Sequence, residues 1–129
     1  MNRVFVYGTL KSGNRIRGLD AFPGANFIGK DFTADEAFDM MDLGPFPAVI
    51  PGGRSYIEGE VWEVSAEVFD QLDEIEGYPD FYLRQIIETQ NHGAAWIYYL
   101  LDDRGATRMQ PDEKNILRWT HASHTINAA

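Results

Sequence analysis

Apolar residues occur in short runs whose spacing changes along the chain. Val4 to Tyr7 form a continuous apolar run, the pattern of a strand that is buried on both faces. From residue 55 to 64 apolar and acidic residues alternate, which predicts a half-buried strand, and Gly59 within it predicts a β-bulge. Residues 81–87 and 94–101 are two further apolar runs, and the short polar segment between them predicts a β-hairpin.

One segment has the spacing of an amphipathic helix. Ser65 is a favourable N-cap and Gly77 is typical of the position just after a helix, so a helix is expected between them. At about 100° per residue, one face is apolar and most acidic side chains fall outside it, where they are expected to be solvated. The apolar face comprises Val68, Phe69, Leu72 and Ile75, and the acidic residues outside it are Glu67, Asp70, Asp73 and Glu74.

The remaining segments are less regular. Residues 16–22 predict a short helix, and residues 35–53 contain three prolines and three glycines, which predicts short extended pieces joined by turns. Residues 111–119 predict a helical turn, and the last few residues predict a frayed end. Together these elements predict a single α+β domain over residues 1–129, in which a curled sheet packs against one strong helix.

Charge and composition narrow the function classes. The 129 residues carry a formal net charge of −9. Nucleic acid and anionic membrane surfaces are therefore not expected partners, because binding to phosphates needs a basic surface. The chain has no cysteine, which excludes disulfides and thiolate chemistry. No apolar run approaches the about 18–20 residues of a membrane span and no signal segment is evident, so a cytoplasmic location is the default expectation.

The first strand ends in a loop that contains two glycines. Gly8 and Gly13 have the spacing of a phosphate-binding P-loop, but Asn14 and Arg15 stand where that motif has its lysine and hydroxyl residue. A nucleotide site is therefore weakly supported. A strand that enters such a loop can present backbone N–H groups to an anion or a carbonyl oxygen. A tight turn that binds nothing is the alternative that the pattern leaves open.

Glu76 is the acidic residue of the predicted helix that does not lie with the others. It follows Leu72 by four residues and Phe69 by seven, so it projects within the apolar arc, close to the negative end of the helix dipole. Partial desolvation and that dipole both raise the pKa of a carboxyl group, which suits a residue that shuttles protons. A side chain that reaches past the helix end, or that pairs with Arg84, fits the pattern equally well.

These segments together resemble the γ-glutamylcyclotransferase-like family, which includes AIG2-like and γ-glutamylamine cyclotransferase branches. The motifs occur in the family's order over about residues 3–101, and no counterpart is evident after Asp102. They are Tyr7-Gly8-Thr9-Leu10 for Y-G-[ST]-L, GPFPAVIPGG for G-x-[FY]-P-A, GEVWEV for G-E-[VL]-[WY], LDEIEGYPDFYLR for L-D-x-x-E-G followed by Y-x-R, and AWIYYL for a closing strand.

The resemblance implies a fold, a site and a reaction. The fold would be a small, barrel-like mixed sheet with flanking helices, around a cavity in which loop amides bind a γ-glutamyl group. The group would be cyclised to 5-oxoproline, with release of an amine or amino acid and with no cofactor or metal. Glu76 would be the catalytic proton shuttle. The substrate-binding residues would be Tyr7, Gly8, Thr9, Leu10, Tyr82 and Arg84, although a structural ion pair is an equally good role for Arg84.

Other function classes remain open from the sequence. A non-catalytic protein would use the same cavity to bind a γ-glutamyl-like or other small metabolite, and an interaction protein would bind no ligand there. His121 and His124 have no third ligand nearby, so a metal site is not expected. The sequence also leaves the substrate open among glutathione, γ-glutamyl amino acids, γ-glutamylamines and γ-glutamyl acyl groups.

Overall fold

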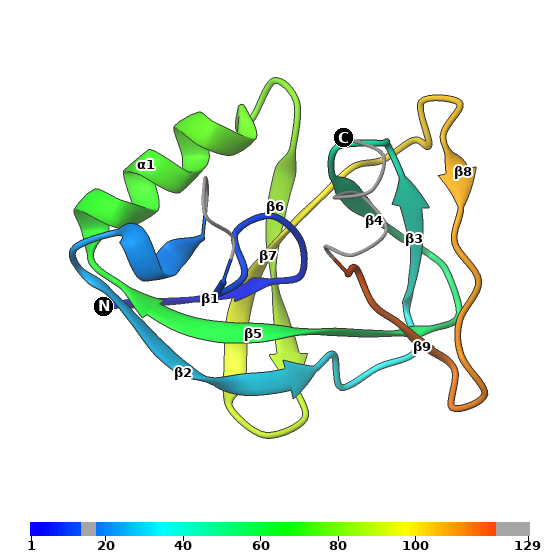
Figure 1. The fold of residues 1–129 in the computed structure, drawn as a ribbon, viewed down its shortest axis with the longest axis horizontal. Helices are drawn as coiled ribbons and strands as arrows, with labels where there is room; N and C mark the ends of the chain where they lie inside the picture. The colour runs from blue at the N-terminus through cyan, green and yellow to red at the C-terminus, as the bar shows by residue number, and fades with distance from the viewer. Residues whose placement is uncertain (14–17, 121–129) are drawn as a thin grey trace.

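The computed structural model describes residues 1–13 and 18–120, and it shows a curled sheet covered by a helix (Figure 1). The strand order in this sheet is β2-β5-β1-β7-β6. The strands are β1 (Asn2–Val6), β2 (Ala25–Phe32), β5 (Tyr56–Val64), β6 (Leu83–Thr89) and β7 (Gly93–Tyr99), and the helix is α1 (Ala66–Glu76). The expected α+β class is confirmed.

Strand β1 lies at the centre of the sheet, as its continuous apolar run predicts. It pairs antiparallel with β5 on one side and parallel with β7 on the other. Val4 and Val6 pack in the core cluster that includes the buried residues of α1, whereas Phe5 packs in the cluster on the opposite face. Successive side chains of a strand point to opposite faces, so a strand buried on both faces must be apolar throughout.

The sheet curls until its two outer strands meet, and this confirms the expected barrel-like form. Thr33, just after β2, forms an antiparallel bridge with Thr89 of β6. Beside it, the N–H of Ala34 donates to the carbonyl of Glu88, and the N–H of Gln90 donates to the carbonyl of Phe32, both at 3.0 Å. These bonds pair backbone groups that an open sheet edge would leave exposed.

A second sheet packs beside the first and supplies one wall of the site described below. It consists of β3 (Phe38–Asp42), β4 (Pro47–Pro51) and β8 (Thr107–Arg108), in the order β4-β3-β8. The expected short extended pieces within residues 35–53 are thus β3 and β4. The carbonyl of Val49 in β4 accepts a hydrogen bond from the N–H of Leu100, just after β7, at 3.0 Å. This bond fixes β4 against the first sheet.

The bounds and caps of α1 agree with the prediction from Ser65 and Gly77. The Oγ of Ser65 accepts a hydrogen bond from the N–H of Val68 at 3.2 Å, and Gly77 has the left-handed φ of 68° that suits glycine. Val68 and Leu72 are buried against the sheet. At 11 residues, α1 is too short to cross a membrane, and no other helix in the described ranges is long and apolar enough to do so.

The β5 strand and the β6–β7 hairpin occur where the alternation and the turn residues predict them, but the predicted bulge is wrong. Pairing of β5 with β2 is regular at Gly59, and the bulge lies in β2 between Phe27 and Gly29. A Cβ on Gly59 would lie 2.5 Å from the carbonyl oxygen of Val6. Glycine is therefore required at residue 59 by the close approach of β1 rather than by a bulge.

Two helical predictions also need correction. In residues 111–119 a turn leads into a strand, β9 (Ile116–Leu117), which pairs in parallel with β5. In residues 16–22 the described part forms a 3₁₀ turn, η1 (Leu19–Ala21), instead of an α-helix. Residues 16 and 17, and the expected frayed end with His121 and His124, lie outside the described residues.

Candidate active site

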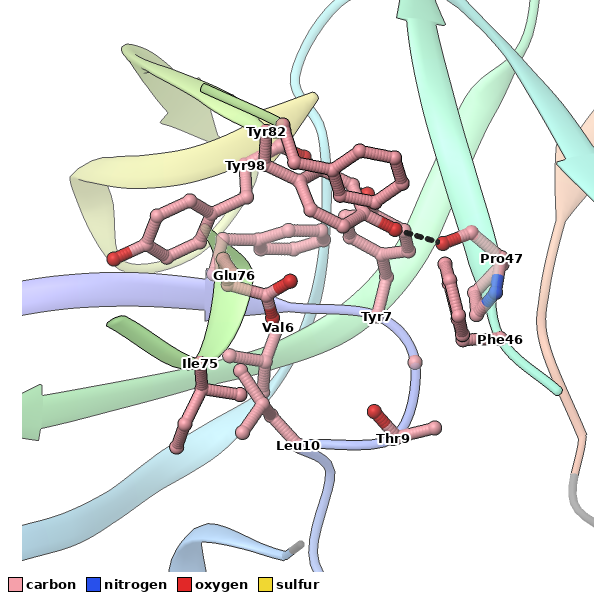
Figure 2. A pocket seen from close by; sticks show the side chains of 13 residues that line it. Val6, Tyr7, Thr9, Leu10, Phe46, Pro47, Ile75, Glu76, Tyr82 and Tyr98 are labelled. Carbon is pink, nitrogen blue, oxygen red and sulfur yellow. Dashed lines mark hydrogen bonds between the residues drawn. The ribbon is translucent and has the colours of Figure 1, made fainter. Parts of the chain in front are cut away.

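A cavity of about 120 Å³ lies where the loop after β1, the end of α1 and strand β4 come together (Figure 2). One water needs about 10–15 Å³ on the same measure, so the space is enough for part of a small metabolite. The lining includes Tyr7–Leu10, Glu76 and Tyr82, which are six of the seven residues that the resemblance implicates. Arg84 is the exception and does not line the cavity.

The loop after β1 turns back sharply where it lines the cavity. The carbonyl of Gly8 accepts a hydrogen bond from the N–H of Lys11 at 3.1 Å, and the carbonyl of Leu10 accepts one from Leu19 at 3.0 Å. Within the described part of the chain, no group accepts a hydrogen bond from the N–H of Gly8, Thr9 or Leu10. Donors of this kind can bind a carboxylate or a polarised carbonyl oxygen.

Gly8 allows the loop to contact β4 closely. A Cβ at this position would lie 2.8 Å from both Cγ and Cδ of Pro47, a distance that forces one of the two groups to move. The carbonyl of Pro47 in turn accepts a hydrogen bond from the hydroxyl of Tyr82 at 2.6 Å (Figure 2). Gly8, Pro47 and Tyr82 therefore form one continuous part of the wall.

The tyrosine hydroxyls at the cavity are already hydrogen-bonded to protein groups. The Tyr7 hydroxyl donates to the carbonyl of Tyr98 at 2.8 Å and accepts from the N–H of Val49 at 3.2 Å. The Tyr98 hydroxyl donates to Asp73 at 2.7 Å. Burial raises the pKa of Tyr7, Tyr82 and Tyr98 well above the ordinary value, so these hydroxyls stay protonated near neutral pH. They shape the cavity and are poorly suited to acid–base chemistry.

Glu76 is the carboxylate that faces the cavity. It is the last residue of α1, its side chain is half-buried, and Figure 2 shows the carboxylate directed towards the other lining side chains. After burial, its negative charge is a further reason that the pKa of Tyr82 is raised. Glu74 is exposed. The predicted contrast between the two glutamates is thus confirmed in their placement.

The prediction that Asp73 is solvated is wrong. Its carboxylate accepts hydrogen bonds from Arg84 Nε at 2.9 Å, from Arg84 Nη2 at 3.2 Å and from the Tyr98 hydroxyl. The hydrogen bond to Asp73 raises the pKa of Arg84. The Arg84 guanidinium carbon also lies 4.3 Å from the ring centroid of Tyr78 and 4.6 Å from that of Trp96. Arg84 therefore has an ion-pair role, with Asp73 rather than Glu76 as its partner, and the pair joins α1 to the β6–β7 hairpin.

No group of three or more potential metal-ligating side chains is found within residues 1–13 and 18–120.

The sequence model of the family described as "Gamma-glutamyl cyclotransferase, AIG2-like" matches residues 4–120. The chain belongs to this family. The match continues past residue 101, where the family's recognisable motifs end, and includes β8 and β9.

Individual members of the γ-glutamyl cyclotransferase family show the same relationship. The "Gamma-glutamylcyclotransferase family protein YtfP" of Escherichia coli K12 is 34% identical over 98 residues, covering 74% of this chain and 80% of that protein. A "Gamma-glutamylaminecyclotransferase" of rat is 35% identical over 97 residues, covering 70% of this chain and 64% of the rat protein.

Solved structures of similar proteins have the same fold. A mouse AIG2-like protein has a TM-score of 0.67 at 29% identity, covering 78% of this chain and 77% of that one. The protein PH0828 of Pyrococcus horikoshii has a TM-score of 0.67 at 28% identity, covering 84% and 86%. The fold described above is thus shared with these two experimentally determined structures.

Proposed function

We propose that this protein converts a γ-glutamyl amide into 5-oxoproline and a free amine or amino acid. The observation that carries the proposal is that Glu76 and the loop residues Gly8–Leu10 line one cavity. Membership of the γ-glutamyl cyclotransferase family and the similarity to the rat γ-glutamylamine enzyme support it. The substrate would be a small molecule.

The reaction needs one bond to form and one to break. The α-amine of the γ-glutamyl group attacks its own γ-carbonyl carbon and closes a five-membered lactam. The bond from that carbon to the leaving nitrogen then breaks. Both reacting groups belong to one molecule, so a cavity that holds the substrate folded supplies much of the rate.

Glu76 would move the proton that this reaction transfers. As a carboxylate it would take a proton from the substrate's ammonium group, which makes the amine nucleophilic. It would then return that proton to the leaving nitrogen. The attacking nitrogen loses a second proton as the lactam forms, and this proton would pass by the same route to the released amine, which leaves as an ammonium ion, so Glu76 ends the cycle unchanged. Its place at the end of α1, inside the cavity, suits both steps because the attacking and leaving nitrogens are bonded to the same carbon in the intermediate.

The N–H groups of Gly8, Thr9 and Leu10 would bind the substrate or the oxyanion that develops on the γ-carbonyl oxygen. One such donor contributes about 10²–10³ in rate in other enzymes. Tyr82 would form part of the wall of the substrate cavity. Arg84 would act only through Asp73, by holding the helix that carries Glu76.

The test is an assay for 5-oxoproline with a panel of γ-glutamyl compounds, in the presence and absence of a chelator. Glutathione, γ-glutamyl amino acids and γ-glutamylamines form the panel. The wild type and Glu74→Gln should release 5-oxoproline from at least one compound, unaffected by the chelator. Glu76→Gln should be slower by about 10²-fold or more, because the proton shuttle is lost.

Glu74→Gln is the matched control, since it removes an exposed carboxylate from the same helix turn. Equal loss of activity in both variants would contradict the role of Glu76. A wild type that forms no 5-oxoproline from any compound, yet retains a small metabolite that mass spectrometry detects after denaturation, would instead identify a binding protein.

A further inference from the structure

A buried carboxylate outside the cavity lining is hydrogen-bonded to the loop that follows β1. Glu60 of β5 is 6% exposed and does not line the cavity. Its Oε1 accepts hydrogen bonds from the N–H of Ser12 at 2.8 Å and from Trp62 Nε1 at 3.0 Å, and its Oε2 accepts one from Ser12 Oγ at 2.7 Å. Two of these three bonds go to the loop, two residues after Leu10.

Burying the Glu60 carboxylate costs desolvation free energy, and the overall stability of the fold does not require a charged group here. Burial of a charge without partners is strongly unfavourable, and even a paired buried charge can often be replaced by an apolar group of similar volume without loss. An apolar side chain, however, cannot accept a hydrogen bond from the N–H of Ser12. The bonds of Glu60 therefore specify where the loop lies more than they stabilise the core.

The rest of the loop is held at points on either side of Ser12. The Nζ of Lys11 donates to the carbonyl of Trp119 at 2.6 Å, and the N–H of Gly13 donates to Asp20 at 3.2 Å. At its start, Gly8 is in close contact with Pro47, as described above. The loop is thus held at several points, and the hydrogen bonds to Glu60 hold it at Ser12.

We propose that Glu60 is a positioning residue that holds residues 8–12, so that the N–H groups of Gly8, Thr9 and Leu10 stay aligned along the cavity. The proposal rests on the proposed function, because those N–H groups are the ones assigned to the substrate. Hydrogen-bond donors stabilise a developing charge best when they are held in place before the reaction. Glu60 acts through Ser12 and does not touch the reacting atoms.

The experiment compares three variants by enzyme kinetics and by amide hydrogen exchange. Glu60→Met removes the acceptors but fills most of the volume, and it should lower kcat/KM by about tenfold or more while speeding exchange selectively at residues 8–12. Glu60→Gln keeps an oxygen for the Ser12 N–H, and its amide can donate to Ser12 Oγ, so it should restore most of both properties. Ser12→Ala removes one bond only and should give a smaller change of the same kind.

Glu58→Met is the matched control, because Glu58 lies two residues away in β5 and bonds Arg118 instead of the loop. It should leave exchange at residues 8–12 unchanged. If Glu60→Met has wild-type exchange at the loop, or if exchange rises equally over β1 and β5, the proposal is overturned. Should the wild type form no 5-oxoproline, the proposed function fails, and selective exchange at residues 8–12 still decides whether Glu60 holds the loop.

Discussion

At the scale of single residues, the shape of the cavity depends on a position where no side chain fits. Gly8 is the clearest case, because Pro47 occupies the space that a Cβ would need. We expect Gly8→Ala to lower the free energy of unfolding by about 1–3 kcal/mol through overpacking, and to lower kcat/KM because Pro47 belongs to the cavity wall. Thermal unfolding and the 5-oxoproline assay measure the two effects. Wild-type stability and kinetics in this variant would show that the loop and β4 are not in such close contact.

Thr9, the next residue, provides the contrasting prediction. The loop's proposed contribution comes from backbone N–H groups, so Thr9→Ala should keep kcat/KM within about threefold of the wild type. Its melting temperature checks that the fold is intact. A loss of about a thousandfold with unchanged stability would mean that the Thr9 hydroxyl takes part in the chemistry.

At the scale of elements, the ion pair between Asp73 and Arg84 fixes the end of α1 on the β6–β7 hairpin. Arg84→Ala leaves a half-buried carboxylate short of its donors and removes the guanidinium from between Tyr78 and Trp96. We expect the free energy of unfolding to fall by about 1–3 kcal/mol. We also expect kcat to fall, because Glu76 lies three residues after Asp73 in the same helix.

Arg108→Ala is the control for this prediction. Arg108 pairs with Asp39, but its side chain is 60% exposed. An exposed pair contributes about 0–1 kcal/mol, so urea unfolding of this variant should be close to the wild type. Equal destabilisation by the two substitutions would argue that the Asp73–Arg84 pair has no special structural role.

At the scale of the whole molecule, closure of the sheet brings a buried acid to the β6–β7 turn. Asp31 of β2 accepts hydrogen bonds from the N–H groups of Phe32 and Asn91, and its Oδ2 lies 2.6 Å from Nδ1 of His92. Burial by itself raises the pKa of Asp31, but hydrogen bonds from Phe32, His92, Thr89 and Asn91 outweigh it, and the pKa is lower than in a free aspartate.

Because the pKa of Asp31 is lower in the folded protein, its contribution to the free energy of unfolding depends on pH. A group whose pKa is lower in the folded state stabilises the fold above its unfolded pKa, and that contribution is lost as the pH falls through the folded value. Asp31→Asn should therefore be less stable than the wild type at pH 5, and the difference should shrink below about pH 4, near the pKa of a free aspartate. Urea unfolding at pH 5 and below pH 4 tests this prediction. Asp35→Asn is the control, because Asp35 is exposed. A difference that does not change with pH would contradict the prediction.

The features that could be predicted from the sequence are those with a local signal. The α1 bounds follow from Ser65 and Gly77, and the central place of β1 follows from its continuous apolar run. The opposite placement of Glu74 and Glu76 follows from helix periodicity alone. Asp73 was missed because it lies only about 40° beyond Phe69 around the helix. At that edge, the position of the hairpin decides whether a side chain meets water or a partner.

The sequence by itself thus determined the α+β class, the main strands and helix, the family and the position of Glu76 within the apolar arc of α1, because periodicity, caps and motifs act over a few residues. The tertiary structure decided which distant residues meet. Ser12 and Glu60 are 48 positions apart, and Asp31 and His92 are 61 apart. Strand β9, with two residues, has no periodicity of its own and exists because the first residues of β5, Tyr56 and Ile57, lie beyond the pairing with β1 and can pair with it. Such contacts follow from sheet register and closure, which no short stretch of sequence encodes.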